Sequence, residues 1–392
     1  MKILEITFIP PATNKGGGYL GIYQSIRSLQ SFATVDYIGP EFDLDIFRQN
    51  FDNVHFIQKD RNIFRRMYYL GKGITTSYYY DFLQCVKEID WKKYDAVHID
   101  SSRYYFLVKM AKENHVITAV RYHNIEKDYA DSLYRIDSNI INFLQTIIFP
   151  QNEKKVTKEA DLLIFITNND QNRADILYQI EKSYKIINPV SIERRERREI
   201  YNNNKCSINL LITGTLNFGP NIRGILWFVN NVWKQVNNSN IYLTIAGFKP
   251  CNEIYDLVNR FQRIKIVDSP EDMHLIFEEA DICVAPIFDG AGMKIKVAEA
   301  LSEGLPVIGT PHAWIGYEKI NKGKYLVKNE SEFLTAIEEL TKRIEEIRKL
   351  SDEIIADFNE NLSMEHSATV YKDAFCKIIN SRKIKGVLND YN

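Results

Sequence analysis

The strongest constraint on the fold lies in residues 281–310, which read DICVAPIFDGAGMKIKVAEALSEGLPVIGT. The hydrophobic pattern predicts a strand over residues 281–285, a glycine loop over 289–292, a helix over 294–302 and a second strand over 306–309. A helix that joins two successive strands in this way is typical of a parallel sheet. The segment therefore predicts an α/β fold.

The loop inside this unit has the composition of a phosphate site. Gly290 and Gly292 carry no Cβ, so the backbone can come close to a ligand there. The free N–H groups and the positive dipole end of the following helix point into the loop and favour an anion. Lys294 and Lys296 oppose that dipole, so they need another reason to be there, and Glu299 can accept two ribose hydroxyls. An ordinary unit with solvated lysines is the alternative, but these features together favour the site.

The same stretch resembles a motif of the family-4 glycosyltransferases, which have the GT-B fold. Their pattern is roughly G-x-G-x-[RK]-x-K-x-x-E-A-x-x-x-G-x-P-V, and GAGMKIKVAEALSEGLPV follows it at nearly every position. Many members carry two glutamates seven residues apart. Here Glu299 is the second of them, the first position is Ala291, and Asp289 lies nearby. The resemblance implies a catalytic role for Lys294 and Lys296 and donor contacts from Gly290, Ala291, Gly292, Met293 and Glu299.

A second match to the same family follows the predicted strand at residues 208–213. The sequence there is GTLNFGPNIRGILWFVNNVW, and relatives show a strand, G-[ST], an aromatic residue, P-N and a W-F helix. Gly214 would let backbone N–H groups meet a phosphate, and Arg223 would add positive charge. Asn221 is the expected N-cap of the helix. Many relatives place an arginine and a lysine just after this strand, and that pair is missing here in clear form.

The first half of the chain begins with a strand over residues 3–9, three glycines at 16–18 and a helix from Tyr19. The dinucleotide pattern G-x-G-x-x-G is absent. The resemblance places Gly17 and Gly18 in a cleft near the acceptor, and a flexible loop is an equal alternative.

A histidine follows the predicted strand at residues 116–120. Ligands bind at the carboxyl ends of strands in open α/β sheets, so His123 is well placed for function. The resemblance puts it near the transferred sugar and adds Asn124 and Glu126 to the cleft, whereas a structural role is the alternative. His98 lies inside a strand and is expected in the core.

Basic and aromatic residues alternate over residues 61–80, RNIFRRMYYLGKGITTSYYY. Such a segment can lie at a lipid headgroup surface or hold an acceptor sugar. A pair of helices that pack their aromatic side chains inward explains it equally well.

Length and composition favour two soluble domains. The chain has 392 residues, 45% hydrophobic and 26% charged residues, and a net charge of −1, so no global basic signal points to nucleic acid. The five cysteines show no paired spacing, and the N-terminal residues enter a strand directly. No apolar run reaches the roughly 18 residues of a spanning helix. We therefore expect a cytoplasmic protein, with any membrane contact peripheral and at the inner face.

The resemblance implies a GT-B architecture, with two Rossmann-like doubly wound domains facing across a cleft. The expected parts are an acceptor domain over residues 1–190, a linker over 191–205, a donor domain over 206–365, and a helix over 366–392 that crosses back to the first domain. The implied reaction moves a sugar from a nucleotide-diphosphate sugar to a saccharide or lipid-linked acceptor in surface polysaccharide synthesis. It would retain the anomeric configuration and need no metal or other cofactor. Two alternatives are an epimerase of the same fold and a non-catalytic partner protein.

Overall fold

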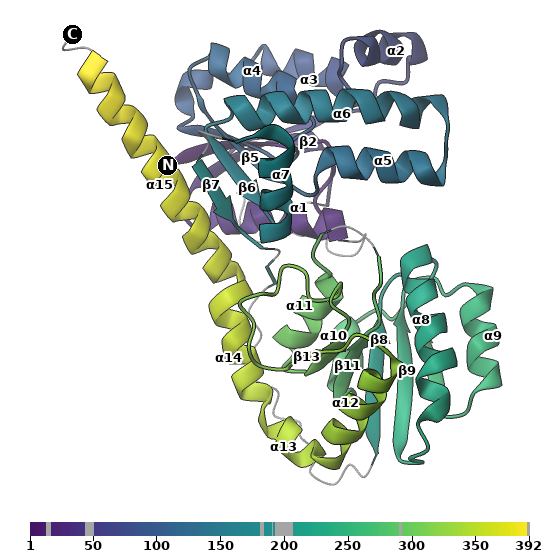
Figure 1. The fold of residues 1–392 in the computed structure, drawn as a ribbon. Coiled ribbons are helices and arrows are strands. Elements are labelled where there is room, and N and C mark those ends of the chain that lie inside the picture. The colour runs from purple at the N-terminus through teal and green to yellow at the C-terminus, as the bar shows by residue number, and fades with distance from the viewer. Residues whose placement is uncertain are drawn as a thin grey trace. The chain divides into compact units, whose positions relative to one another are not determined.

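The computed structural model describes residues 1–12, 17–43, 51–180, 184–189, 191–192, 207–289 and 292–389, with side chains up to residue 382. The chain divides into two compact units (Figure 1). Unit 1 comprises Met1–Val190 together with Ser367–Asn392, and unit 2 comprises Ser191–His366. Most of the predicted linker, residues 193–205, lies outside the described residues.

Unit 1 is built on a seven-stranded sheet in the order β3-β2-β1-β4-β5-β6-β7. Every pair of neighbouring strands is parallel. Parallel sheets are covered on both faces, and these strands are correspondingly rich in buried Ile, Leu and Val. The strands are β1 (Lys2–Ile6), β2 (Thr34–Pro40), β3 (Val54–Ile57), β4 (Ala96–Ile99), β5 (Ile117–Tyr122), β6 (Leu162–Phe165) and β7 (Tyr184–Ile187).

Helices cover both faces of this sheet. One core joins the sheet to α3, α4, α6 and α7, and the other joins it to α1 and to the C-terminal helix α15. The helices are α1 (Gly17–Gln30), α2 (Ile63–Gly71), α3 (Tyr79–Val86), α4 (Tyr105–Glu113), α5 (Glu126–Ile136), α6 (Ile140–Glu159), α7 (Asn168–Tyr178) and α15 (Met364–Asn389). His98 is fully buried in β4, as predicted.

The C-terminal helix α15 begins in unit 2, and its residues from Ser367 onward belong to unit 1. Tyr371 and Phe375 pack into the core beneath α1. The Tyr371 hydroxyl lies 2.9 Å from the Ser25 hydroxyl. The apolar stripe of this helix is thus satisfied by the first Rossmann-like unit.

Unit 2 repeats the same plan with six parallel strands in the order β10-β9-β8-β11-β12-β13. The strands are β8 (Ile208–Thr213), β9 (Ile241–Gly247), β10 (Ile264–Asp268), β11 (Ile282–Ala285), β12 (Val307–Gly309) and β13 (Lys324–Leu326). The helices are α8 (Gly219–Asn231), α9 (Asn252–Arg260), α10 (Met273–Glu278), α11 (Ile295–Ser302), α12 (Glu330–Lys342), α13 (Ile344–Lys349) and α14 (Ser351–Leu362). Two doubly wound parallel sheets confirm the predicted α/β class.

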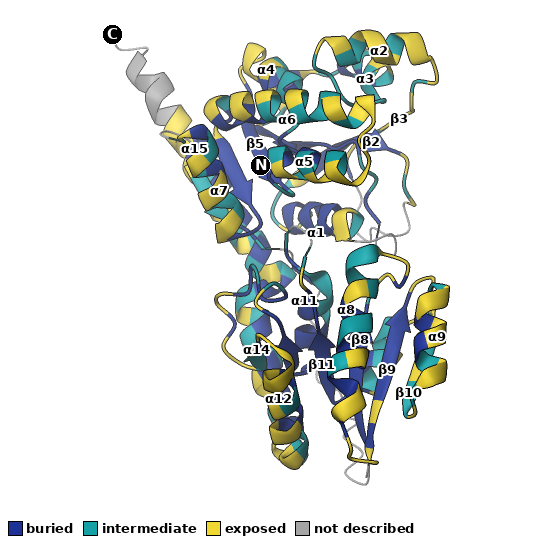
Figure 2. Cartoon of the chain, turned by 45° about the vertical axis from the view of Figure 1, so that its right-hand side comes forward, coloured by how far each residue is buried: buried dark blue, intermediate teal, exposed yellow. Residues whose placement is uncertain are grey.

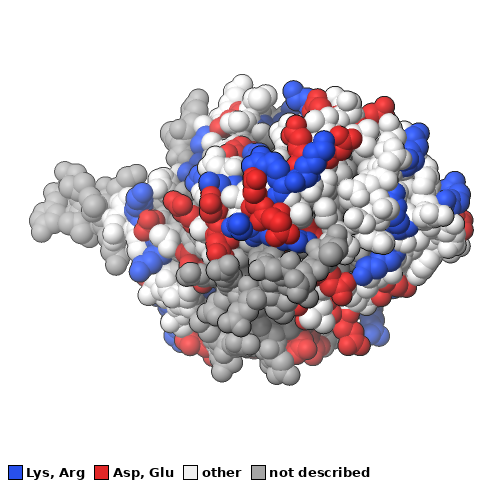
Figure 3. Space-filling model, turned by 90° about the horizontal axis from the view of Figure 1, so that it is seen from below, with Lys and Arg blue, Asp and Glu red and all other residues white. Residues whose placement is uncertain are grey.

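The strand order reverses next to β1 in unit 1 and next to β8 in unit 2. The carboxyl ends of strands on either side of such a switch point form the usual ligand site of an open α/β sheet. On the face of the molecule drawn in Figure 3, acidic and basic side chains are interspersed. We therefore look for the site at these strand ends.

The basic and aromatic segment at residues 61–80 divides into two helices with different environments. None of the nine residues of α2 is buried, and Phe64 is 83% exposed (Figure 2). In α3, Phe82 is fully buried, and Tyr78 and Tyr79 pack against the core. In α2, the ring centroid of the half-buried Tyr69 lies 4.7 Å from that of Tyr79, whereas Phe64, Met67 and Tyr68 are exposed. Inward packing of the aromatic side chains therefore holds for α3 and for Tyr69 of α2.

Candidate functional site

The candidate site of unit 2 lies at the carboxyl ends of β8 and β11. These neighbouring strands flank the switch point of the sheet. The loop after β8 leads into α8, and the loop after β11 leads into α11. Side chains from both loops and both helices can therefore meet there.

Asn221 joins these two loops. The Lys296 Nζ donates to Asn221 Oδ1 at 2.7 Å, and Asn221 Nδ2 donates to the Thr215 carbonyl at 2.9 Å. The predicted N-cap role of Asn221 is wrong, because α8 begins at Gly219 and Phe218 is its N-cap. The amide faces Lys296 instead.

Gly214 makes room for this contact. Its φ of 148° lies in a region that favours glycine. A Cβ at Gly214 would lie 2.8 Å from Asn221 Nδ2 and 2.9 Å from Lys296 Nζ. A larger residue would therefore displace both partners.

Lys294 occupies the N-cap position of α11 and is held by its own loop. Its Nζ donates to the Gly292 carbonyl at 2.7 Å, and Gly292 has a φ of 68°, which also favours glycine. The Tyr317 hydroxyl donates to the Lys294 carbonyl at 2.7 Å and accepts from the Ala298 N–H at 3.1 Å. The buried tyrosine thus fixes the start of the helix from below.

Lys296 is half-buried in the first turn of α11. Burial, the largest influence, lowers the pKa of Lys296 to about 8. Cys283 and Glu299 oppose that change, and Lys294 adds to it. Bringing an anion to this group would relieve the cost of keeping it charged.

The remaining predicted donor residues of unit 2 are arranged around these lysines. Arg223 forms an ion pair with Asp289 across the two loops, and both side chains are exposed. Met293 is buried and Glu299 is half-buried on α11. Gly290 and Ala291 lie outside the described residues.

In unit 1, the corresponding strand ends carry a tightly paired charge cluster around Asp100, directly after β4. His123 Nε2 lies 2.8 Å from Asp100 Oδ1, and Arg121 Nη1 lies 3.2 Å from the same oxygen. Burial would raise the pKa of Asp100, but its interactions with His123 and Arg121 hold it well below its usual range. Asp100 and Arg121 are nearly inaccessible, whereas the His123 side chain is 15% exposed.

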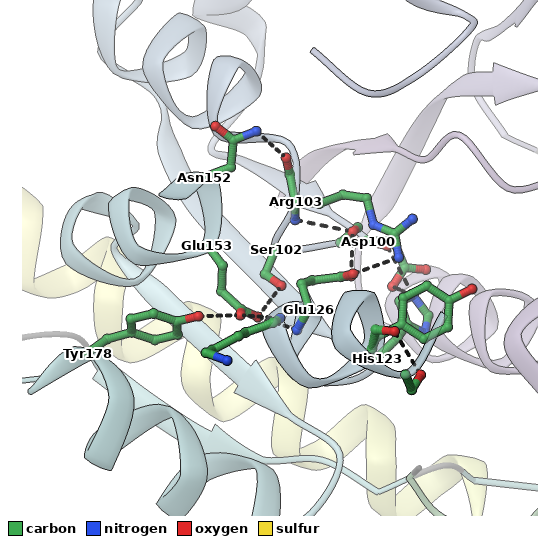
Figure 4. Close-up of polar contacts among 12 residues, drawn as sticks. Asp100, Ser102, Arg103, His123, Glu126, Asn152, Glu153 and Tyr178 are labelled. Atoms are coloured by element: carbon green, nitrogen blue, oxygen red, sulfur yellow. Dashed lines mark hydrogen bonds and ion pairs between the residues drawn. The ribbon is translucent and has the colours of Figure 1, made fainter. Parts of the chain in front are cut away.

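A second network ties the loops after β4 and β5 together (Figure 4). Arg103 donates to Glu126 Oε2 at 2.7 Å, and the buried Glu153 of α6 accepts from Tyr178 and Ser102 and from the backbone N–H of Glu126. Burial, with Glu126 adding to it, raises the pKa of Glu153 to about 7. Glu126 thus helps to hold two loops, and its contact with an acceptor stays a prediction.

The other predicted residues of unit 1 are less constrained. Asn124 is half-buried beside His123 in the sequence. Gly17 and Gly18 are exposed in the first turn of α1, and a Cβ at Gly18 would meet no atom within 4 Å. None of the described residues requires glycine at Gly18, and a ligand contact there remains a prediction.

Sequence reasoning named Lys296 but missed the contact of Asn221 with it, and it did not name Tyr317 or Asp100. Asn221 and Lys296 are 75 residues apart, so no local pattern links them. Tyr317 follows a different strand from the helix it supports. Asp100 carries a visible signal, since it directly follows the buried strand that contains His98 and precedes two serines.

A family model describes the same part of unit 2. Residues 207–343 match the family described as Glycosyl transferases group 1. This range includes both lysines, Asn221 and Gly214. The match confirms the predicted resemblance to glycosyltransferases and the enzyme class that it implies, whereas the assignment to family 4 stays a prediction.

The whole chain also resembles proteins of similar length. A Klebsiella pneumoniae protein named "Uncharacterized 44.6 kDa protein in cps region" is 25% identical over 394 residues, which cover 92% of this chain and 96% of that protein.

Solved structures share the GT-B architecture at low identity. Sucrose-phosphate synthase from Thermosynechococcus elongatus superimposes with a TM-score of 0.70 at 14% identity, covering 97% of this chain and 99% of that one. Anabaena HepE in complex with UDP gives 0.67 at 11%, covering 96% and 100%. WaaG, a glycosyltransferase involved in lipopolysaccharide biosynthesis, gives 0.61 at 13%, covering 96% and 99%. These likenesses confirm the fold.

Proposed function

We propose that this glycosyltransferase moves a sugar from a nucleoside-diphosphate sugar to a saccharide or lipid-linked acceptor in the synthesis of a surface polysaccharide. The observation that carries the donor side is the pair of lysines at the start of α11, with Lys296 held by a neutral amide. Two ammonium groups and a helix N-terminus favour a diphosphate. The relative in a cps region and the UDP complex of HepE support this choice of reaction and donor.

The proposed chemistry is departure of the diphosphate, stabilised by cations. Lys294 and Lys296 neutralise the charge that develops on the leaving oxygen, as preorganised groups do in other enzymes. The anomeric configuration is retained, because the acceptor attacks from the face that the diphosphate leaves. His123 lies near the transferred sugar in this proposal, and no metal ion takes part.

The experiment begins with a thermal-shift screen against UDP, GDP, ADP, CDP and their sugar conjugates. A ligand at 100 times its Kd stabilises the folded state by about 2.7 kcal/mol. The best donor is then incubated with saccharide and lipid-linked acceptors, with and without EDTA. A product of retained configuration, formed equally in EDTA, is expected. An inverted product or a requirement for a metal ion would overturn the corresponding part of the proposal.

The same proposal includes contact with an anionic membrane at the cytoplasmic face, through α2. Phe64, Met67 and Tyr68 are exposed on this helix, and Arg61 and Arg66 are exposed beside them. Residues 59–72 contain five basic residues and one acidic residue. Each basic residue near an anionic lipid surface contributes about 1 kcal/mol.

The turn between α5 and α6 adds a second apolar surface. Ile136 is 83% exposed and Ile140 69%, and Ile141, Phe143 and Ile147 are also exposed. In Figures 1 and 2 this turn and α2 lie at the same end of unit 1. No helix among the described residues is long and apolar enough to cross a bilayer.

Vesicle sedimentation tests this contact. We expect binding to vesicles containing phosphatidylglycerol and a loss of at least fivefold in Phe64→Ser/Met67→Ser and in Ile136→Ser/Ile140→Ser. Ile176→Ser is the matched control, since Ile176 is 74% exposed on α7. Equal binding by all variants, or self-association in place of vesicle binding, would contradict the contact.

A further inference from the structure

We infer that Asn221 is a positioning residue that holds the Lys296 ammonium in place for the donor diphosphate without neutralising it. The inference rests on the proposed function for its ligand, and on described contacts within unit 2 for its geometry. In this inference, Asn221 acts through Lys296 and does not contact the substrate.

The contacts fix the orientation of the Asn221 amide. Its Nδ2 donates to the carbonyl of Thr215, so its Oδ1 faces Lys296 and accepts from Nζ. A carbonyl oxygen can only accept, and an ammonium can only donate, so both halves of the amide are committed. The amide thus links the loop after β8 to the first turn of α11.

A neutral partner matters for an anion site. A carboxylate in the same place would form an ion pair with Lys296 and compete with a diphosphate. An amide oxygen supplies direction and a hydrogen bond, while the full positive charge stays available to a ligand. The Gly214 turn leaves space for this arrangement, since a methyl group there would lie within 3 Å of both partners.

The charge on Lys296 is finely balanced. Burial lowers its pKa to about 8, Glu299 on the same helix and Cys283 on β11 oppose this, and Lys294 adds to it. The hydrogen bond to Asn221 Oδ1 favours the charged form. Removing the amide should therefore lower the pKa of Lys296 further. Replacing the amide by a carboxylate should raise that pKa.

The first test measures the ionisation of Lys296 in the ligand-free protein. The rate of acetylation of this lysine by acetic anhydride is followed by mass spectrometry from pH 6.5 to 10.5. The midpoint of the profile should fall in Asn221→Ala and rise by about one unit or more in Asn221→Asp. Asn230→Ala is the matched control, because Asn230 lies on the same helix and donates only to Leu226.

The second test measures binding of UDP by calorimetry at pH 7.5. Asn221→Ala should bind UDP at least fivefold more weakly than the wild type, and Asn221→Asp should bind it more weakly still. The two variants should nevertheless shift the pKa of Lys296 in opposite directions. A residue of purely structural importance would not produce opposite shifts in the acetylation profile.

The outcomes separate this inference from the proposed function. Opposite midpoint shifts without any UDP binding by the wild type would support the placement of Lys296 and count against UDP as the donor nucleotide. Unchanged midpoints in both variants would overturn the inference, whatever the protein binds. If Asn221→Ala does not fold, Asn221→Asp, which preserves the size of the side chain, still decides it.

Discussion

The two Rossmann-like units treat the cations at their strand ends differently. In unit 1, the Arg121 guanidinium and the His123 imidazole meet the buried carboxylate of Asp100. In unit 2, Lys296 meets an amide oxygen, and Lys294 donates to a backbone carbonyl. Arg121 is thus held by a buried carboxylate, whereas Lys296 is held by a neutral amide, and the ion pair of Arg223 with Asp289 in unit 2 is exposed.

The difference separates stability from ligand binding. Charges compensated by buried carboxylates hold loops, and they leave little net field for a ligand. Cations placed by neutral acceptors cost more to keep charged, as the pKa of Lys296 shows, and an anion can recover that cost. In the proposed function, the diphosphate therefore binds to unit 2, whereas the charged residues of unit 1 hold loops.

The largest expected effect is the loss of stability when the charge cluster around Asp100 in unit 1 is disrupted. Asp100→Asn leaves the buried Arg121 without its carboxylate and should lower the free energy of unfolding by about 3–5 kcal/mol, measured by urea denaturation. Asp128→Asn is the control, because Asp128 pairs with Arg173 at the surface and should cost less than about 1 kcal/mol. Equal losses of stability in the two variants would show that the buried cluster contributes no more to stability than a surface ion pair.

The next effect comes from Gly214→Ala. The substitution forces an unfavourable backbone conformation and pushes a methyl group against Asn221 and Lys296. We expect a loss of about 1–3 kcal/mol in stability, from thermal unfolding, together with loss of UDP binding. Gly18→Ala faces open space and should change stability by less than about 1 kcal/mol. Full UDP binding by Gly214→Ala would argue against this geometry.

The pH dependence of binding sharpens the comparison. The pKa of Lys296 is lowered to about 8, so the ammonium is present below that pH and is lost as the pH rises through it. UDP affinity measured by calorimetry should therefore fall above pH 8, approaching tenfold per unit. In Lys296→Arg the side chain stays charged at every pH tested. The UDP affinity that this variant retains should therefore not change with pH over the same range. A steep decline in that variant too would assign the effect to another group.

The smallest expected effect lies on α2 of unit 1. Phe64→Ser should change the free energy of unfolding by no more than about 0.5 kcal/mol, because the side chain packs against little. Phe82→Ala, at a fully buried position on α3, should cost about 3–5 kcal/mol in the same denaturation experiment. A large loss in Phe64→Ser would mean that α2 is part of the folded core.

Much of the fold could be predicted from the sequence because its signals are local. The apolar strands and the helices between them are encoded in short hydrophobic patterns, and His98 lies in the core as expected. The strand ends then follow from the order of elements. The lysines of α11 could be placed at such an end from the sequence alone.

The contacts that give the site its character are not local. Asn221 has the usual propensity of an N-cap, and only the folded sheet brings it to Lys296. The sequence does not determine the exposure of α2 either, because alternating basic and aromatic residues suit a buried helix pair and a surface equally well. Tertiary packing decided between them.

The central claim is that ammonium groups at the start of α11 bind the diphosphate of a nucleotide-sugar donor. Calorimetric titration with UDP, GDP, ADP and CDP, applied to the wild type and to Lys294→Ala/Lys296→Ala, tests it most directly. We predict that the wild type binds at least one of these ligands and that the double variant, still folded, binds it at least 100-fold more weakly. Equal affinity in the two proteins, or no binding of any of the four by the wild type, would contradict the account.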